Sequence, residues 1–346
     1  MYYNWKEYIV ENELKEVSNL IRKGEIVIFP TETVYGIGAN AFDKKAIEKI
    51  FKAKGRPSDN PLIVHVSDKE QINDIAQNIT DIESKLINAF MPGPFTIILE
   101  KKENIPDVVT AGLDTVAVRI PSNLIARELI SASNVPVAAP SANISGRPSG
   151  TTIEDIKREL EGKVSVIIDG GETEIGLEST VVKVIDEIPV ILRPGKITPE
   201  DIRKIVGVVK IDDKVFEKVD KNQKVESPGM KYSHYAPEAK CKLIYFKEDI
   251  KQIYTIEKFI EEYKSNVVVL GFSEHKNKIK ISKDKFIDIG SKDDLEQIGK
   301  RIYTSLRKAD KMKPEIILIE GIKREGLGIA IMNRLLRTCE YDFIEG

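Results

Sequence analysis

The sequence is short of the side chains on which several common chemistries depend. Its 346 residues include only two cysteines and three histidines. Cys241 and Cys339 lie far apart in the C-terminal third, which is neither a disulfide framework nor a zinc-ligand spacing, and we interpret both as inert thiols. The scattered histidines make no zinc site, and no serine–histidine–aspartate or cysteine–histidine arrangement has a readable spacing. Zinc chemistry and covalent catalysis are therefore disfavoured.

The chain also lacks an excess of charge of one sign and a long hydrophobic run. Lysine and arginine total 53 and aspartate and glutamate 55, so the net charge of -2 gives no broad basic surface for nucleic acid. No segment approaches the roughly 18 uncharged apolar residues that a membrane span needs. The N-terminus has no basic region followed by an apolar stretch, as a secretory signal would. We therefore expect a cytoplasmic location and no membrane partner.

Two familiar nucleotide-binding motifs are missing as well. The chain has no Gly-x4-Gly-Lys-[Ser/Thr] loop, and no Gly-x-Gly-x-x-Gly follows a strand. Neither P-loop nor dinucleotide-type phosphate binding is supported.

The length and an interruption in the hydrophobic pattern predict two domains. A chain of 346 residues exceeds the size at which one hydrophobic core usually keeps growing. Between about residues 211 and 237 the periodicity disappears into a charged run that is poor in apolar residues. We therefore predict a first domain over residues 1–210, a linker over 211–240 and a second domain over 241–346.

The first domain alternates irregularly between helices and strands. Apolar spacing predicts a helix from Trp5 to Ile21, a buried strand at Ile26–Phe29 and a ligand-bearing loop at Pro30–Gly38. We expect further helices at Asp43–Lys54, Ser67–Ala76, Asp81–Phe90 and after Thr198, and further strands at Leu62–Val66, Phe95–Leu99, Thr115–Arg119, Val135–Ala139, Val164–Ile168, Thr180–Ile185 and Val190–Leu192. The pattern predicts an α/β or α+β fold with a mixed sheet.

The second domain alternates regularly. Strands are expected at Lys242–Phe246, Asn266–Leu270 and Glu315–Ile319, and helices at Asp249–Tyr263, Lys292–Ala309 and Gly328–Leu336. Such alternation is typical of a parallel sheet covered on both faces. We therefore expect a smaller Rossmann-like α/β/α domain at the C-terminal end.

Lys54 and Arg56 could form a cationic fork. They flank Gly55 at the end of a predicted helix, where a glycine lets the chain turn so that both cations leave on one side. Arginine offers two parallel donors and lysine a point charge, which together suit polyphosphate or carboxylate. The alternative is simple capping of the helix dipole by cations. His65, in a nearby apolar run, fits a buried core histidine as well as a ligand-binding one.

The segment Ala139–Gly150 could form a polar cradle opposite this fork. It follows a strand, precedes a helix and concentrates hydroxyl groups, small residues and backbone amides where anions bind well. Gly176–Thr180 and Leu192–Gly195 repeat the pattern, the second with another arginine at the end of a strand. Each segment also fits an ordinary connecting loop. A phosphate or ribose cradle fits the segment, and from these residues alone both interpretations stay open.

Several motifs in one order resemble the YrdC/Sua5 family of threonylcarbamoyl-AMP synthases. They span residues 10–205 and comprise Pro-Thr-Glu-Thr-Val-Tyr-Gly at 30–36, Lys-Gly-Arg-Pro at 54–57 with Asn-Pro-Leu at 60–62, Pro-Gly-Pro-Phe-Thr at 92–96, Ala-Val-Arg-Ile-Pro at 117–121, Ala-Pro-Ser-Ala-Asn-Ile-Ser-Gly at 139–146 and Glu-Ser-Thr at 178–180. The string Ser227–Pro237 is similar to the linker of the long Sua5 subtype, and Met332–Arg337 to its terminal helix. The resemblance implies a YrdC-like twisted mixed sheet with flanking helices, followed by the linker and the Sua5-type domain.

The resemblance also implies an enzyme, a nucleotidyltransferase. L-threonine, bicarbonate or CO2, and ATP would be joined to give L-threonylcarbamoyl-AMP and pyrophosphate, with Mg²⁺ riding on the triphosphate. This is the first step of the t6A modification at position 37 of tRNAs. The product would be handed to the tRNA threonylcarbamoyl transferase, and direct contact with tRNA is left open.

Carried over by motif position, the resemblance implies two groups of site residues. Thr33, His65, Arg119, Ala139 and Ser179 look like the shell around L-threonine. The nucleotide shell looks like Arg56, Asn60, Thr115, Ser141, Asn143, Ser149, Arg193 and Tyr235. Lys54 and Arg56 are the candidate catalytic residues, because phosphoryl transfer asks mainly for positioning and charge neutralisation.

The linker and the rival functions complete the expectations. Tyr232, His234 and Tyr235, close to Gly229, are candidates for a lid that keeps water from a labile carbamate.

One rival function is an RNA-binding module, which the near-neutral charge disfavours. A second is a carbamoyl-transfer enzyme of the kind found in hydrogenase maturation, whose acylphosphatase and zinc-finger segments are absent from this sequence.

Overall fold

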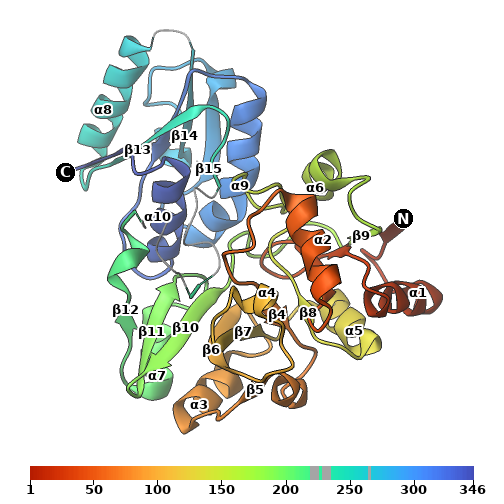
Figure 1. Cartoon of the computed structure of the whole chain (residues 1–346). Coiled ribbons are helices and arrows are strands. Elements are labelled where there is room, and N and C mark those ends of the chain that lie inside the picture. The colour runs from red at the N-terminus through yellow and green to blue at the C-terminus, as the bar shows by residue number, and fades with distance from the viewer. Residues whose placement is uncertain (219–225, 228–234, 264–265) are drawn as a thin grey trace. The chain divides into compact units, whose positions relative to one another are not determined.

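The chain folds into two units, each with its own sheet, in a computed structural model that describes residues 1–218, 226–227, 235–263 and 266–346 (Figure 1). Unit 1 comprises residues 1–145, 149–174 and 178–232, and unit 2 comprises residues 146–148, 175–177 and 233–346. The second unit therefore begins close to the predicted end of the linker and also includes two short segments from the first two hundred residues.

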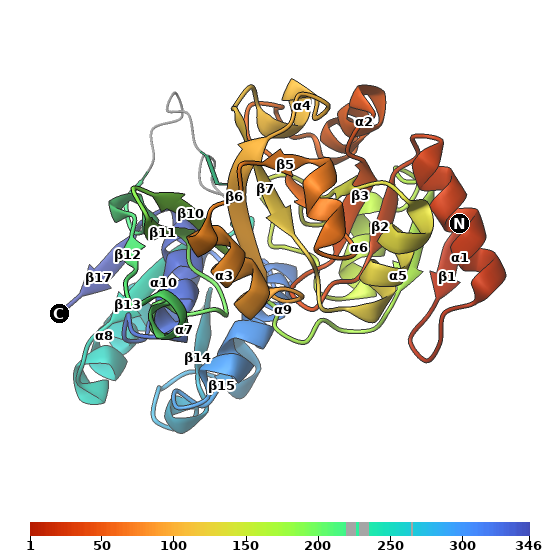
Figure 2. The same ribbon diagram turned by 90° about the horizontal axis from the view of Figure 1, so that it is seen from below.

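Unit 1 is built on a mixed sheet of twelve strands, in the order β1-β9-β2-β3-β8-β4-β7-β6-β10-β11-β12, with β5 paired to β6. The strands are β1 (Tyr2–Asn4), β2 (Val27–Phe29), β3 (Gly36–Asn40), β4 (Ile63–His65), β5 (Ala76–Gln77), β6 (Phe95–Lys101), β7 (Thr115–Arg119), β8 (Val137–Ala138), β9 (Val166–Asp169), β10 (Thr180–Ile185), β11 (Ile188–Arg193) and β12 (Lys210–Ile211). The pairs β4–β7 and β6–β10 are parallel, whereas β6–β7 and β2–β3 are antiparallel (Figure 2). A mixed sheet is what the sequence predicts.

The helices of unit 1 flank this sheet, and all of those named below except α1 and α4 begin at a residue whose side chain caps the helix. They are α1 (Glu11–Arg22), α2 (Lys44–Lys54), α3 (Asp81–Phe90), α4 (Asp107–Thr110), α5 (Leu124–Ser133), α6 (Ile153–Leu160) and α7 (Pro199–Val206). Asp43 caps α2 by accepting from the backbone amides of Lys45 and Ala46. Thr198 caps α7 in a reciprocal capping box with Asp201, and Pro199 occupies the first turn, as the sequence predicts.

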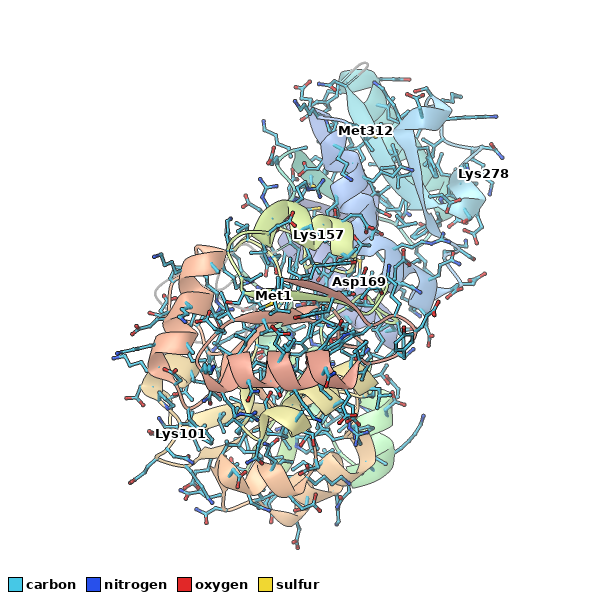
Figure 3. All side chains as sticks on the ribbon, turned by 90° about the vertical axis from the view of Figure 1, so that its right-hand side faces the viewer. Met1, Lys101, Lys157, Asp169, Lys278 and Met312 are labelled. Atoms are coloured by element: carbon cyan, nitrogen blue, oxygen red, sulfur yellow. The ribbon has the colours of Figure 1, made fainter. Side chains whose placement is uncertain are left out.

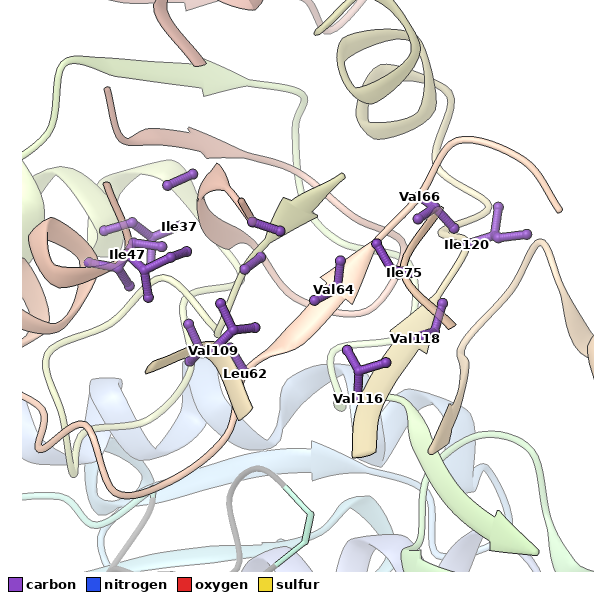
Figure 4. Close-up of a cluster of buried hydrophobic side chains, with 14 of the residues drawn as sticks. Ile37, Ile47, Leu62, Val64, Val66, Ile75, Val109, Val116, Val118 and Ile120 are labelled. Atoms are coloured by element: carbon purple, nitrogen blue, oxygen red, sulfur yellow. The ribbon is translucent and has the colours of Figure 1, made fainter. Parts of the chain in front are cut away.

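The buried apolar side chains of unit 1 form three clusters, the smallest of which comprises Ile63, Ile98, Ala117, Val181 and Leu192. The largest cluster includes Ile37, Ile47, Val64 and Val118 (Figure 4). A second cluster packs Trp5 among residues of α1, β2 and α5. The sequence predicts a helix starting at Trp5, but α1 begins only at Glu11; Trp5 follows β1 and is buried, with 1% of its surface exposed.

Strand β1 sits at the edge of the sheet through its pairing with β9. Tyr3 is level with Ile168, and the Tyr2 hydroxyl donates to Asp169 over 2.6 Å. The ammonium of Lys157 lies 3.5 Å from the centre of the Tyr2 ring. Figure 3 labels Lys157 and Asp169 near the chain start. The first residues of the chain are thus tied to a strand more than 160 residues later.

Unit 2 has a five-stranded sheet, all parallel, in the order β15-β14-β16-β13-β17. Its elements are β13 (Lys240–Tyr245), α8 (Asp249–Glu262), β14 (Val267–Phe272), β15 (Phe286–Gly290), α9 (Leu295–Lys311), β16 (Ile316–Glu320), α10 (Leu327–Thr338) and β17 (Phe343–Glu345). The Rossmann-like prediction is confirmed. The sequence analysis did not foresee β15 and β17, and it extended the start of α9 by three residues, to Lys292.

Other predicted elements differ in detail. The helix expected at Ser67–Ala76 is a single 3-10 helix at Glu70–Asp74, and helix α5 was not foreseen. The predicted loop at Pro30–Gly38 ends earlier, because Gly36 already starts β3. Among the described residues of both units, no helix combines the length and apolar character that crossing a membrane requires.

Gly38, in the middle of β3, leaves no room for a side chain. A Cβ there would lie 2.6 Å from both the Phe29 ring and a Val137 methyl group, whereas one at Gly36 would come no closer than 3.4 Å to its neighbours. Gly38→Ala should therefore destabilise unit 1 by about 1–3 kcal/mol through overpacking, and Gly36→Ala by less. Urea unfolding followed by the fluorescence of Trp5, the single tryptophan of the chain, measures both. Equal losses would contradict this explanation.

Candidate functional site

The predicted cationic fork begins where α2 ends. Gly55 adopts a left-handed conformation, with φ of 61°, and its amide and that of Arg56 bond back to Lys52 and Phe51. This turn brings Lys54 and Arg56 back toward the protein, so that only 2% and 8% of their surfaces are exposed. The sequence correctly predicts the glycine turn. Both cations are buried, which a simple helix cap would not require.

Lys54 joins the fork to the polar cradle. Its ammonium donates to the backbone oxygen of Ser141, to that of Asn143 over 2.7 Å, and to the Asn143 side chain over 3.4 Å. The Ser141 hydroxyl in turn donates to the same amide oxygen over 2.6 Å. Burial, and then the charge of Arg56, hold the pKa of Lys54 well below its usual value. An anion placed beside these two cations would relieve this cost.

Arg56 lies against the segment that leads into β4. Its guanidinium donates to the backbone oxygens of Asn60 and Pro61 over 2.9 and 3.2 Å. The Asn60 side chain is fully buried, and neither of its polar atoms has a hydrogen-bond partner within the described part of the chain. Buried amides are normally satisfied, so this side chain is a strong ligand-binding candidate. Thr115 is the first residue of β7, which pairs in parallel with β4. It therefore lies at the end of this strand pair where Asn60 precedes β4.

A second polar group surrounds Arg119 at the other end of β7. Its guanidinium donates to the Thr33 hydroxyl over 2.9 Å and to the Gly93 backbone oxygen over 3.2 Å. Glu32 lies 2.7 Å from it as an ion pair that is almost fully buried. Burial alone would raise the pKa of Glu32, but Arg119 outweighs it and the pKa is lowered. A buried arginine with a fixed orientation is suited to binding a carboxylate.

His65 is level with Arg119 on the neighbouring strand. The histidine is 3% exposed, and burial followed by the charge of Arg119 lowers its pKa to about 3. Its Nδ1 atom has no hydrogen-bond partner among the residues described. His65 is therefore neutral near pH 7, with one ring nitrogen available to a polar ligand.

Ser179 and Arg193 form a third group at the start of β10 and the end of β11. The Arg193 guanidinium bonds the backbone oxygen and the hydroxyl of Ser179, each over 3.1 Å, and Thr96 shares a 2.7 Å hydrogen bond with that hydroxyl. Ser149, from the cradle loop, donates to Glu178 over 2.5 Å. Residues from four distant segments of the chain thus meet at one end of the sheet.

Ala139 and Tyr235 complete the predicted residues. The Ala139 amide bonds the backbone oxygen of Ile63, so the cradle loop leaves the sheet beside β4. Tyr235 belongs to unit 2, where its ring stacks on Tyr303 at 5.2 Å and Arg334 lies 5.8 Å from its centre. The other lid candidates, Tyr232 and His234, lie outside the described residues, so the lid stays a prediction.

Three polar residues of these groups were not singled out from the sequence as site residues. Glu32 pairs with Arg119, Thr96 bonds Ser179, and Glu178 accepts from Ser149. All three are at most 9% exposed, and all three stand inside motifs that the sequence analysis quotes. The sequence does give a sign of such residues: a charged or hydroxyl side chain that stands next to a candidate ligand-binding residue within an apolar segment.

The neutral state of His65 predicts how the stability of unit 1 depends on pH. Its pKa is lower in the folded than in the unfolded chain, so the unfolded state binds an extra proton below about pH 6.5 and the stabilisation is lost as pH falls. From pH 7.5 to 5 this effect should cost about 2 kcal/mol. Unfolding followed by Trp5 fluorescence should show this loss of stability between pH 7.5 and 5. In His65→Leu, which lacks the titrating group, the loss over the same pH range should be smaller by about 2 kcal/mol. An unchanged pH dependence in the variant would contradict the prediction.

Taken together, these groups offer two kinds of binding surface within unit 1. Lys54, Arg56 and the hydroxyl and amide groups near them suit phosphate and ribose. Arg119, Thr33 and neutral His65 suit a small molecule with a carboxylate and a polar side chain. No three histidine, cysteine, aspartate or glutamate side chains of the described residues cluster as a protein-held metal site would require.

Comparisons with known proteins agree with this geometry. The Sua5/YciO/YrdC family model, described as "Telomere recombination", matches residues 19–195, and one described as "Threonylcarbamoyl-AMP synthase, C-terminal domain" matches residues 197–339. The chain is 43% identical over 345 residues to a threonylcarbamoyl-AMP synthase of Pyrococcus abyssi, covering 99% of this chain and 98% of the relative. For the Bacillus subtilis relative of the same name the identity is 42% over 329 residues, with coverages of 94% and 93%.

A solved structure extends the likeness to the whole fold. The crystal structure of P. abyssi Sua5 complexed with L-threonine superposes with a TM-score of 0.93 at 42% identity, covering 100% of this chain and 99% of that one. Fold and site thus define a two-unit α/β protein with buried polar and charged side chains gathered in unit 1. The chain belongs to the Sua5/YrdC family, in the long form that carries the additional C-terminal domain, as its motifs predict.

Proposed function

We propose that this protein is a threonylcarbamoyl-AMP synthase, which joins L-threonine, bicarbonate and ATP and releases pyrophosphate. The observation that carries the proposal is the pair of buried cations Lys54 and Arg56, in the same unit as Arg119. Lys54 bonds the Ser141–Asn143 cradle, and Arg56 bonds the backbone of Asn60 and Pro61. A reaction between a nucleotide and an amino acid needs both kinds of binding surface side by side. The relatives named above carry the same name over nearly the whole chain.

The proposed reaction requires no nucleophilic side chain. Bicarbonate takes up a proton and loses water to give CO2, and the threonine amine adds to this CO2, giving a carbamate and releasing a proton. A carbamate oxygen then attacks the α-phosphorus of ATP, a new O–P bond forms, and the bond to pyrophosphate breaks. The attacking group is already an anion, so positioning and stabilisation of charge on the phosphoryl oxygens are the main requirements. The product class makes the enzyme a nucleotidyltransferase.

Each group of residues has a role in this proposal. Lys54, Arg56 and Arg193 neutralise charge on the phosphates, while Asn60, Thr115, Ser141, Asn143, Ser149 and Tyr235 hold the nucleotide. Arg119 pairs with the threonine carboxylate, and Thr33, His65, Ser179 and the Ala139 backbone surround the rest of the amino acid. Neutral His65 accepts or donates a hydrogen bond without adding a charge. Magnesium enters with ATP as part of that substrate, held mainly by its phosphates and waters.

One assay tests the proposal against its two rivals. The purified chain is incubated with ATP and bicarbonate plus either L-threonine or L-serine, and the carbamoyl adenylate is sought by mass. The expected product carries threonine and appears with an equal amount of pyrophosphate. An RNA-binding module would give no adenylate, and a carbamoyl-transfer enzyme would need carbamoyl phosphate. Hand-over of the labile product to the tRNA-modifying transferase is part of the proposal, and adding that enzyme and tRNA to the assay extends the test.

A further inference from the structure

A pocket of about 620 Å³ lies on unit 1 behind the cationic fork. Its walls come from the second half of α2, the start of β2, the turn after α6 and the loop after β8. Its size is in the range of small-molecule sites. We call it the lysine groove, because Lys49, Lys52 and Lys163 surround an apolar floor formed by Ile26, Ala53 and Ile144.

The groove carries an excess of positive charge. Glu25 is its one acidic lining residue, and that charge is already engaged. One carboxylate oxygen accepts from Lys49 over 2.9 Å and the other from the Ser165 hydroxyl over 2.5 Å. These hydrogen bonds, the one from Ser165 first, lower the pKa of Glu25. Lys52 and Lys163 are exposed, and the ammonium group of neither forms an ion pair or hydrogen bond with any described residue.

The floor of the groove is less polar than its rim. Ile26 is buried and Ala53 and Ile144 are half-buried, while the aliphatic stems of lysines can extend over such a surface with their ammonium groups in water. A ligand that matches this arrangement has an apolar or aromatic body and a compact, doubly charged anion at its edge. A phosphate monoester meets both requirements, and lysine ammonium groups are common phosphate ligands.

The groove is separate from the proposed catalytic site but shares a wall with it. Lys54 lines the groove, yet its ammonium points to the backbone oxygens of Ser141 and Asn143. Lysines at the end of α2 also complement the helix dipole. That explanation does not extend to Lys163, which comes from the turn after α6, more than a hundred residues later.

We propose that the lysine groove binds a small organic phosphate, with the phosphate between Lys52 and Lys163 and the apolar body on the floor. This site is additional to the one that binds threonine and ATP in the proposed function. Since Lys54, Gly55 and Ile144 are among its lining residues, its occupant contacts the segments that carry the fork and the cradle.

Pyridoxal 5′-phosphate is a suitable probe because it unites an aromatic body, a phosphate and a lysine-reactive aldehyde. The aldehyde condenses with a lysine amine, releasing water, and borohydride reduces the imine to a stable secondary amine. At a probe concentration equal to that of the protein, peptide mapping should find Lys52 and Lys163 labelled at least tenfold more than Lys44 and Lys45. These two are exposed lysines of the same helix that do not line the groove.

Two controls separate the proposal from general lysine reactivity. Excess inorganic phosphate should suppress the preference, and pyridoxal without the phosphate should show none. Lys163→Gln should reduce labelling of Lys52 severalfold, while Lys45→Gln should not. Labelling that is equal at all four lysines, or that is indifferent to phosphate or to Lys163→Gln, overturns the proposal.

Discussion

Arg56→Ala should lower threonine-dependent pyrophosphate release at least about 100-fold, as expected when a donor that stabilises transition-state charge is removed. Lys54→Ala should have an effect of the same order, since both side chains are buried and the charge of Arg56 is felt at Lys54. Arg56→Lys should recover only part of the activity, because the charge returns without the two parallel donors. Initial rates of pyrophosphate release with saturating ATP and threonine measure all three variants.

Folding and charge must be controlled in this experiment. Lys54 and Arg56 donate to backbone oxygens, so their loss could also loosen the fork. Trp5 fluorescence checks that the variants remain folded, and Lys45→Ala removes an exposed lysine from the same helix as a matched control. Near-normal turnover in folded Arg56→Ala and Lys54→Ala would defeat the assignment of the fork.

Glu32→Gln should destabilise unit 1 and weaken threonine binding. The change leaves the buried guanidinium of Arg119 without its counter-charge 2.7 Å away. Breaking a buried ion pair from one side typically costs about 3–5 kcal/mol. Because Glu32 orients a guanidinium that is also held by Thr33 and Gly93, the KM for threonine should rise at least about tenfold, more than kcat falls.

A double variant distinguishes positioning from simple loss of stability. Glu32→Gln combined with Arg119→Met removes both charges and should recover part of the stability without recovering threonine binding. Glu32→Asp keeps the charge and should retain more threonine affinity than Glu32→Gln. Losses that simply add in the double variant, or an unchanged KM for threonine in Glu32→Gln, would show that the pair does not act as a unit.

The motifs indicate which segments carry the polar side chains better than they indicate the contacts between those side chains. Lys54 with Ser141 and Asn143 was foreseen as fork and cradle, because a glycine turn and a polar loop have clear local signatures. Glu32 and Thr96 could not be assigned in this way. A pattern of residue types does not say which side chain a buried carboxylate or hydroxyl will face across the sheet.

The same distinction applies to the fold. Elements with strong local signals, such as the capping box of α7, lie where the sequence predicts them. The N-terminal strand β1 was missed because three residues carry little periodicity, and their conformation depends on pairing with β9. Strand β17 is equally short and depends on its pairing with β13. Whether such a short segment becomes a strand depends on its pairing with a distant segment, and a single sequence does not show that pairing.

The pairing of β1 with β9 has a consequence for how the protein is made. During synthesis the first strands leave the ribosome long before residues 166–169, which they need as neighbours. Ser179 and Arg193 emerge later still, although Ser179 shares a hydrogen bond with Thr96, more than eighty residues earlier. The buried polar groups of unit 1 are therefore complete only when nearly all of this unit has been translated.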